Sequence, residues 1–285
     1  MIKTRRRNPG EVYVKGQTAD LPAEIAEVLD QFQLGEIVSL VGLRSRTNLN
    51  LLLTTSDGRY VLRSSPPSRS LASVAFEHRL LCYLAEQGFP AIVPILSRQM
   101  TTWLILNDQL WTLCEFFDGE PLDRTLPEHV AEAARCLAAY HRAVRGFDAG
   151  DHQRAGKTDI IEWLQSSAES PLSLYTAEQP NVEEARGYLV ESWQSLNDSV
   201  ASSGITRLPR VIIHGDFSRR NMLFQDNTLV AVLDFDGCHL EIRPMDVAIA
   251  LKNVCRGPEK HAQVFMSRVC AFMNAYKSTV LLSVI

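Results

Sequence analysis

The sequence predicts an α+β fold, in which a half rich in strands precedes a half rich in helices. Short alternating or β-branched runs, separated by turn residues, recur up to about residue 117. From there on, longer segments place apolar side chains at helical spacing. We therefore divide the chain into residues 1–117 and residues 118–285. Within the first half, residues 1–18 are expected to form a disordered or loosely docked arm.

Two helices are expected in the first half. Apolar residues recur every three or four positions over Leu21–Leu34, and Asp20 precedes Pro22 as a suitable cap. A second helix over Leu71–Glu86 ends where Gly88 begins a turn. The expected strands are Glu36–Val41, Asn48–Thr54, Arg59–Arg63, Ile92–Leu96, Thr102–Leu106 and Leu110–Phe117.

Helices dominate the second half, but strands are expected near its middle. The β-branched run Val211–Ile213 predicts one strand, and Gln225–Asn227 is a good hairpin turn between Asn221–Phe224 and Thr228–Leu233. The expected helices are Glu128–Val144, Asp159–Ser167, Val182–Ser202, Met245–Cys255 and Glu259–Lys277.

The strand and hairpin carry the most informative motif of the chain. His214-Gly215-Asp216 ends the strand, Asn221 follows, and Asp234-Phe235-Asp236 comes after the hairpin. This order and spacing are typical of a kinase catalytic loop followed by a metal-binding loop. They indicate phosphoryl transfer from a nucleoside triphosphate. The alternative is a turn after a strand with acidic residues on its solvated side. This alternative explains each part of the motif taken alone, but it explains the whole motif less well.

Phosphoryl transfer needs a positioned hydroxyl group and neutralisation of phosphate charge. Asp216 would accept or orient the proton of the attacking hydroxyl. Asn221 offers a neutral amide oxygen and Asp234 a carboxylate, which are oxygen ligands suited to Mg²⁺. The hairpin is expected to bring these three side chains into one cleft.

The resemblance to a known family extends beyond this motif. The segments HGDFSRRNMLF and VLDFDG, with Asp246 in the later Pro-x-Asp, resemble the aminoglycoside phosphotransferase and choline kinase superfamily. The segment LEIRPMDVAIALKNVC is most similar to its homoserine kinase and spectinomycin phosphotransferase branch. The resemblance covers roughly residues 36–275. It implies a two-lobed, protein-kinase-like fold with a small antiparallel-sheet lobe and a larger, mostly helical lobe.

The same resemblance implies that the first half binds ATP or GTP. Gly42 begins a strand–turn–strand segment over the phosphates, and Arg63 takes the position of the residue that clamps them. Glu77 is the expected ion-pair partner of Arg63, unless it is a solvated carboxylate. Glu115 and Phe117 belong to the segment expected to meet the adenine.

Other polar residues near the motif are expected to support it. His214 and Asp246 should hold the catalytic loop through hydrogen bonds. Asp236 should either help to bind the metal or only fix its loop. Arg219 and Arg220 could contact phosphate or an anionic substrate, or could be solvated charges.

Bulk properties favour an ordinary soluble globular enzyme located in the cytoplasm. The net charge of −4 gives no support to a nucleic-acid or membrane-surface role, and no apolar run is long enough to span a membrane. The six cysteines are scattered without a C-x-x-C pair, as in a reduced protein without zinc or disulfides. We expect a monomer or a homodimer.

We therefore predict an ATP-dependent, Mg²⁺-dependent phosphotransferase acting on a hydroxyl group of a small polar molecule. Residues 118–285 hold 22 Asp and Glu against 17 Lys and Arg, which favours an amino-bearing acceptor. Candidates are an aminoglycoside (which would imply antibiotic resistance), an aminocyclitol, an amino alcohol or homoserine. The acceptor site is expected among Asp118–Asp123, Asp159–Ser202 and Gly237–Arg243. Alternatives are a bacterial stress-type protein Ser/Thr kinase and a nucleotide-binding pseudokinase regulator.

Overall fold

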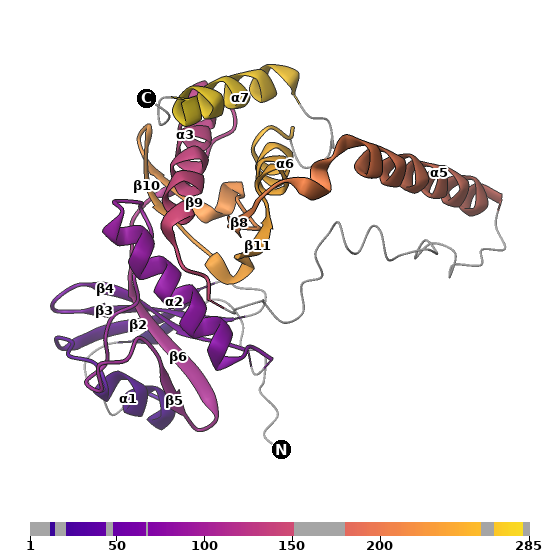
Figure 1. Ribbon diagram of the computed structural model, residues 1–285. Coiled ribbons are helices and arrows are strands. Elements are labelled where there is room, and N and C mark those ends of the chain that lie inside the picture. Colours follow the sequence, from indigo (N-terminus) through magenta and orange to yellow (C-terminus); the bar gives the residue numbers. More distant parts are fainter. Residues whose placement is uncertain are drawn as a thin grey trace.

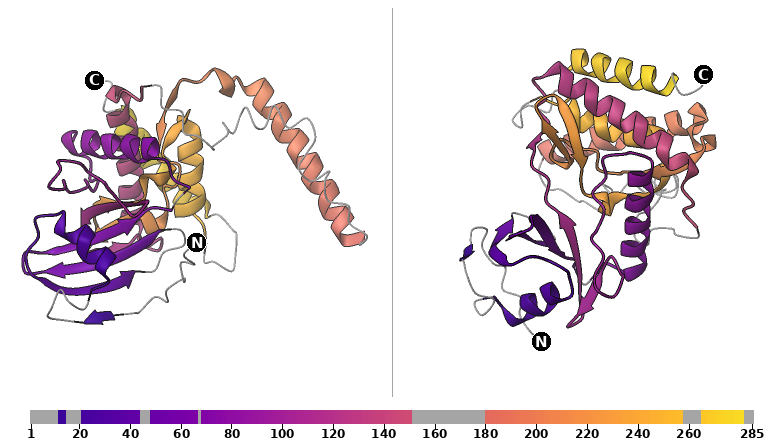
Figure 2. Two further views of the ribbon diagram at one scale, coloured as in Figure 1. Left: turned by 90° about the horizontal axis from the view of Figure 1, so that it is seen from below. Right: turned by 90° about the vertical axis from the view of Figure 1, so that its left-hand side faces the viewer.

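The computed structural model describes residues 12–14, 21–43, 48–66, 68–150, 180–257 and 265–281. A strand-rich part and a helix-rich part lie next to each other, as Figures 1 and 2 show. Two separate clusters of buried apolar side chains form their cores. The predicted α+β class is confirmed. The described helices include none that is long and apolar enough to cross a membrane.

The sheet of the first part has six antiparallel strands in the spatial order β1-β2-β3-β4-β6-β5. They are β1 (Val12–Val14), β2 (Ile37–Leu43), β3 (Leu49–Thr55), β4 (Arg59–Ser64), β5 (Leu104–Leu106) and β6 (Gln109–Glu115). Of the arm expected to be disordered or loosely docked, Val12–Val14 form β1 and pair with β2. Helix α1 (Ala23–Asp30) shares the core of this sheet. Its expected cap, Asp20, lies outside the described residues.

Helix α2 (Leu71–Glu86) connects the two parts of the molecule. The Ser70 side chain accepts a hydrogen bond from the Ser73 amide and so caps the first turn. Leu80 and Leu84 are fully buried in the larger core, together with side chains from the second half of the chain. Residues from before and after residue 117 contribute to that core, so the division of the chain into two lobes at this residue stays a prediction.

The segment after α2 differs from the prediction. We expected a strand over Ile92–Leu96, but the structure has only isolated bridges, from Ala91 to Val232 and from Pro94 to Cys114. Proline has no N–H group and cannot donate to a sheet ladder, so Pro94 limits this segment to single bridges.

The helical part is built on the packing of two helices. Helix α3 (Pro127–Ala143) lies alongside α7 (Met266–Leu281), as the views of Figure 2 also show. The other helices of this part are α5 (Pro180–Ser203) and α6 (Arg243–Val254), with single 3₁₀ turns at Val144–Gly146, Ile205–Arg207, Arg219–Asn221 and Phe235–Gly237. The helix expected over Asp159–Ser167 lies outside the described residues.

Two small antiparallel sheets carry the sequence motif. One contains β7 (Glu120–Pro121) and the predicted hairpin of β9 (Met222–Gln225) and β10 (Thr228–Val232). The other pairs β8 (Arg210–Ile213) with β11 (His239–Ile242). We had expected a loop over Gly237–Arg243, but four of its residues form β11. Pairing with β8 decides this segment, and that partner lies some thirty residues earlier in the chain.

Candidate active site

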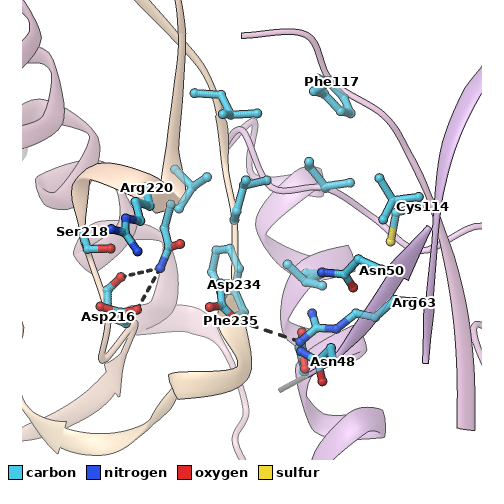
Figure 3. Close-up of a pocket in the computed structure, with 18 of the residues that line it drawn as sticks. Asn48, Asn50, Arg63, Cys114, Phe117, Asp216, Ser218, Arg220, Asp234 and Phe235 are labelled. Atoms are coloured by element: carbon cyan, nitrogen blue, oxygen red, sulfur yellow. Dashed lines mark hydrogen bonds and ion pairs between the residues drawn. The ribbon is translucent and has the colours of Figure 1, made fainter. Parts of the chain in front are cut away.

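The turn after β8 is shaped by a close contact between two backbones. Gly215 has a φ of +78°, and a Cβ atom placed on it would lie 2.5 Å from the carbonyl oxygen of Gly237. A side chain at this position would therefore meet both backbone strain and a steric clash. The tight turn directs the next residue, the exposed Asp216, into the cleft between the two parts (Figure 3).

A buried carboxylate lies beneath this turn. The two oxygens of Asp246 accept hydrogen bonds from the backbone N–H groups of His214 and Gly215, at 2.9 and 3.1 Å. The Nε2 atom of His141 lies 3.1 Å from the same carboxylate, and its Nδ1 lies 2.8 Å from the hydroxyl of Tyr276. Burial alone would raise the pKa of Asp246, but the His141 hydrogen bond and the nearby histidines hold it below its usual value.

The imidazole of His214 links the two loops of the motif. Its Nε2 lies 3.1 Å from the carbonyl oxygen of Leu233, and its Nδ1 accepts a hydrogen bond from the amide of Asp216. Since a carbonyl only accepts, Nε2 carries the proton and Nδ1 does not. Burial lowers the pKa of His214, in agreement with a neutral ring. The ring therefore fixes geometry in this arrangement.

Asn221 lies beside Asp216 at the start of the hairpin. Its Nδ2 donates to the backbone oxygen of Asp216 at 2.9 Å and to the Oδ2 of the same residue at 3.0 Å. Dashed lines at Asp216 in Figure 3 mark these bonds. These bonds orient the carboxylate of Asp216. They also place the amide oxygen of Asn221 on the side away from Asp216, where it could bind a cation.

Asp234 follows the other end of the hairpin in a strained conformation. Its φ of +63° lies in the left-handed region, which aspartate tolerates better than most residues. Burial and the neighbouring carboxylate of Asp236 raise its pKa, although Arg63 opposes this. A divalent cation would relieve this repulsion, so the donor set of Asp234 and Asn221 fits the Mg²⁺ that the sequence predicts.

Two arginines from the first half hold Asp236. Arg63 contacts its Oδ2 at 2.5 Å and Arg69 contacts its Oδ1 at 2.8 Å. Arg63 also approaches Asp234, at 4.0 Å, and Arg69 forms an ion pair with Glu77. We expected Glu77 to pair with Arg63, but its ion pair is with Arg69. Helix α2 turns Glu77 toward the loop that precedes the helix. No pattern in the sequence indicates this role for Arg69.

His78 lies next to Glu77 on α2, and its pKa provides a test of the environment that these arginines create. Burial, Arg69 and Arg63 lower the pKa of His78 to about 3. The unfolded chain takes up a proton as the pH falls through about 6.5, whereas the folded protein does not. From pH 7 to pH 5 this group alone should therefore cost about 2 kcal/mol of stability.

Between pH 7 and pH 5, the free energy of unfolding of His78→Asn should fall by about 2 kcal/mol less than that of the unaltered protein. The measurement is urea unfolding at a series of pH values. His214 and the other titrating groups are common to both proteins and cancel in the difference. Parallel stability curves for the two proteins would show that His78 is protonated in the folded state.

The cleft lined by Arg63, Asp216, Asn221 and Asp234 has a volume of about 1380 Å³. Strands β4 and β6 line one side with Val61, Arg63 and Cys114, while Leu62 points into the core. The catalytic loop lines the opposite side, and Asp234 and Phe235 lie between them in Figure 3. Glu115 and Phe117 also line the cleft, as expected. Gly42 does not, although its neighbour Leu43 does.

Some cleft residues were not predicted. Arg69, Arg124, Asn253 and Arg256 line it, but no role was assigned to any of them from the sequence. The three arginines lie within three residues of the start or end of a helix, and Asn253 lies in the last turn of α6.

The fold and the loop geometry together define a kinase-like phosphotransferase. The model of the phosphotransferase enzyme family matches residues 40–266, and the chain belongs to this family. A homoserine kinase from Methylobacillus flagellatus is 29% identical over 255 residues, which are 89% of this chain and 74% of that protein. The resemblance seen in the sequence, including the homoserine kinase branch, is confirmed. The protein is a kinase whose acceptor is a hydroxyl group.

Solved structures agree on the fold. An aminoglycoside phosphotransferase from Alicyclobacillus acidocaldarius has a TM-score of 0.68 at 16% identity, over 91% of this chain and 78% of that one. An amicoumacin kinase in complex with AMP-PNP and Ca²⁺ has a TM-score of 0.67 at 15% identity, over 90% of this chain and 78% of that one. The two-lobed, kinase-like architecture implied by the sequence is confirmed.

Proposed function

We propose that this kinase transfers the γ-phosphoryl group of ATP, with Mg²⁺, to the hydroxyl of a small amino-bearing molecule, with homoserine as the first candidate. The observation that carries the proposal is the convergence of Asp216, Asn221 and Asp234 on one cleft through a single hairpin. The homoserine kinase relative supports the choice of acceptor. ATP and a divalent cation are in keeping with the AMP-PNP and Ca²⁺ of the amicoumacin kinase complex.

Asp216 is the group that receives the acceptor hydroxyl. Its carboxylate is exposed to the cleft and is oriented by Asn221 at 3.0 Å. A hydroxyl donating to the other carboxylate oxygen would be held for in-line attack, and Asp216 can take its proton as the new bond forms.

The metal site consists of Asn221 and Asp234. Bound Mg²⁺ would neutralise charge on the β- and γ-phosphates. Asp236 serves as the anchor of the metal loop, since both of its oxygens contact arginines. Of the two roles expected for Asp236, this is the one that its contacts support. His214 and Asp246 hold the catalytic loop through the hydrogen bonds described above.

The nucleotide lies against β4 and β6. Arg63 is placed to reach the phosphates because it contacts the metal loop from the opposite side of the cleft. Glu115 and Phe117 line the cleft where β6 leaves the sheet, and the adenine would meet this segment.

An acceptor panel tests the proposal. The purified protein is incubated with Mg²⁺ and ATP and with L-homoserine, 3-amino-1-propanol, an aminoglycoside or a protein substrate. Products are followed by ³¹P NMR and mass spectrometry. Phosphorylation of L-homoserine well above the others is the expected result. Exclusive phosphorylation of the protein substrate would contradict a small-molecule acceptor.

Arg63 provides a separate prediction. Arg63→Ala should raise the KM for ATP and lower kcat, because it removes both a phosphate contact and the link to Asp236. Arg63→Lys should recover part of the activity, since the charge returns without the planar fork that can contact two groups. Arg59→Ala is a matched control on the same strand, because Arg59 pairs with Asp118 and does not line the cleft. An Arg63→Ala enzyme with unchanged kinetics would place the phosphates elsewhere.

A further inference from the structure

Arg69 has a well-defined place in the chain, immediately before helix α2. Its backbone N–H donates to the carbonyl oxygen of Pro66 at 2.9 Å, and the next residue, Ser70, caps the helix. Its side chain lines the cleft and is only 11% exposed. Because the backbone is held on both sides and the side chain is largely buried, the contacts of the guanidinium group have a defined geometry.

The guanidinium group of Arg69 joins two carboxylates from different parts of the molecule. Its Nη1 lies 2.8 Å from the Oδ1 of Asp236, and its Nη2 forms the ion pair with Glu77. Glu77 belongs to α2, whereas Asp236 belongs to the 3₁₀ turn Phe235–Gly237, which follows Asp234. The donors of a planar guanidinium group project in fixed directions, so one arginine can hold both carboxylates at once. Arg69 thus connects α2 to the turn after Asp234.

This turn is fixed through two successive side chains. Phe235 is buried in the larger core, and Asp236 is held by arginines. Asp234 itself lines the cleft, whereas Asp236 is not among the residues that line it. The two residues that follow Asp234 therefore determine where its carboxylate lies, and Arg69 contributes to this through Asp236.

Arg63 does not duplicate the contact that Arg69 makes. Arg63 reaches the Oδ2 of Asp236 from β4 at 2.5 Å, and it points toward Asp234 in Figure 3. It is also the side chain placed to reach the phosphates, and a guanidinium group that turns to a phosphate loosens its hold on a carboxylate. Since Arg69 contacts the other oxygen of Asp236, the turn stays anchored when Arg63 binds the nucleotide.

We propose that Arg69 is a positioning residue for the metal ion that accompanies the nucleotide. By joining Glu77 to Asp236, it holds the carboxylate of Asp234 in place for the metal. The inference rests on the proposed function and adds a residue to its metal site. Loss of a partner that orients metal ligands typically lowers metal affinity or activity by roughly 10- to 100-fold. Arg69→Gln is therefore expected to weaken binding of Mg-AMP-PNP by that factor.

The same variant should bind metal-free AMP-PNP nearly as well as the unaltered protein does. An arginine that contacted the phosphates directly would contribute to both affinities, whereas a positioning residue acts only when the metal is present. Both are measured by calorimetric titration, once with excess Mg²⁺ and once with EDTA. No acceptor is needed, so the result does not depend on the identity of the acceptor.

Arg79→Gln is a matched control on α2. Arg79 is exposed, and its guanidinium group contacts the carbonyl oxygen of Asp148, away from the residues that line the cleft. This variant should bind both forms of AMP-PNP as the unaltered protein does. Arg69→Lys should recover only part of the Mg²⁺-dependent affinity, since an ammonium group restores the charge but lacks the fork that spans two carboxylates.

A double variant guards against a loss of folding. Arg69→Gln removes the ion-pair partner of Glu77, whose side chain is only 7% exposed, and breaking a buried pair in this way is destabilising. Glu77→Gln in the same chain removes the second charge as well. If the two residues act as one bridge, the double variant should lose no more affinity for Mg-AMP-PNP than Arg69→Gln alone.

The outcomes separate the bridge from the function on which it rests. Similar weakening of both forms of AMP-PNP in Arg69→Gln would overturn the positioning role, and so would affinities equal to those of Arg79→Gln. Full recovery in Arg69→Lys, or losses that multiply in the double variant, would contradict the bridge and leave the proposed function intact. Equal affinity of the unaltered protein for AMP-PNP with and without Mg²⁺ would instead contradict the proposed metal site itself.

Discussion

Asp216→Asn is expected to lower kcat by roughly 10²- to 10⁴-fold and to leave nucleotide affinity nearly unchanged. The asparagine side chain has the same shape, and its oxygen can still accept the hydrogen bond that Asn221 donates at 3.0 Å. The loop should therefore keep its structure. What is lost is the carboxylate that we propose takes the proton of the acceptor hydroxyl, a role that contributes to the transition state more than to binding of the nucleotide.

Steady-state kinetics and nucleotide titration measure the two effects separately. Asp226→Asn is a matched control, because Asp226 lies in the exposed turn of the same hairpin at a positive φ that asparagine also tolerates. A turnover of Asp216→Asn close to that of this control would exclude Asp216 as the base.

The second large effect is expected at the proposed metal site. Asp234→Ala should weaken binding of Mg-nucleotide by at least the roughly 10- to 100-fold that removal of an outer-shell partner costs a metal site. Asn221→Ala should be less damaging to that binding, since it removes a neutral ligand instead of a charged one. Both variants should lose turnover, because Asn221 also orients Asp216.

Asp234→Asn separates charge from backbone strain. Asparagine tolerates the left-handed conformation found at this residue, whereas alanine does so less readily. A similar loss of Mg-nucleotide affinity in both variants, measured by titration at several Mg²⁺ concentrations, would assign the effect to the missing charge. If both variants bound the nucleotide normally at every Mg²⁺ concentration, the metal would have to lie at other residues.

The catalytic loop and its hairpin could be predicted because their signals are local. The run of β-branched residues that ends at Ile213 and the turn at Asp226 both determine structure within a few residues. The hairpin then fixes how Asn221 and Asp234 approach each other. On β4, Val61 and Arg63 face the cleft while Leu62 faces the core, which is the alternation that any strand imposes on its side chains.

Contacts between distant segments could not be predicted in this way. The partner of Glu77 depends on the rotation of α2 about its axis, and the loop before the helix offered Arg69 at a position without regular structure. Arg124 lines the same cleft as Arg256 and contacts the carbonyl oxygen of Gly257, although more than 130 residues separate the two segments.

The hydrogen bonds from Asp246 through His141 to Tyr276 also bear on the order in which the protein is completed during synthesis. The ribosome releases residues in chain order, so Asp216, Asn221 and Asp234 emerge well before Tyr276 on α7. Until then, His141 lacks the hydroxyl that lies 2.8 Å from its Nδ1. The catalytic loop thus gains its full set of supporting bonds only after α7 has packed against α3. A nascent chain that already contains every catalytic side chain is therefore still an incomplete enzyme.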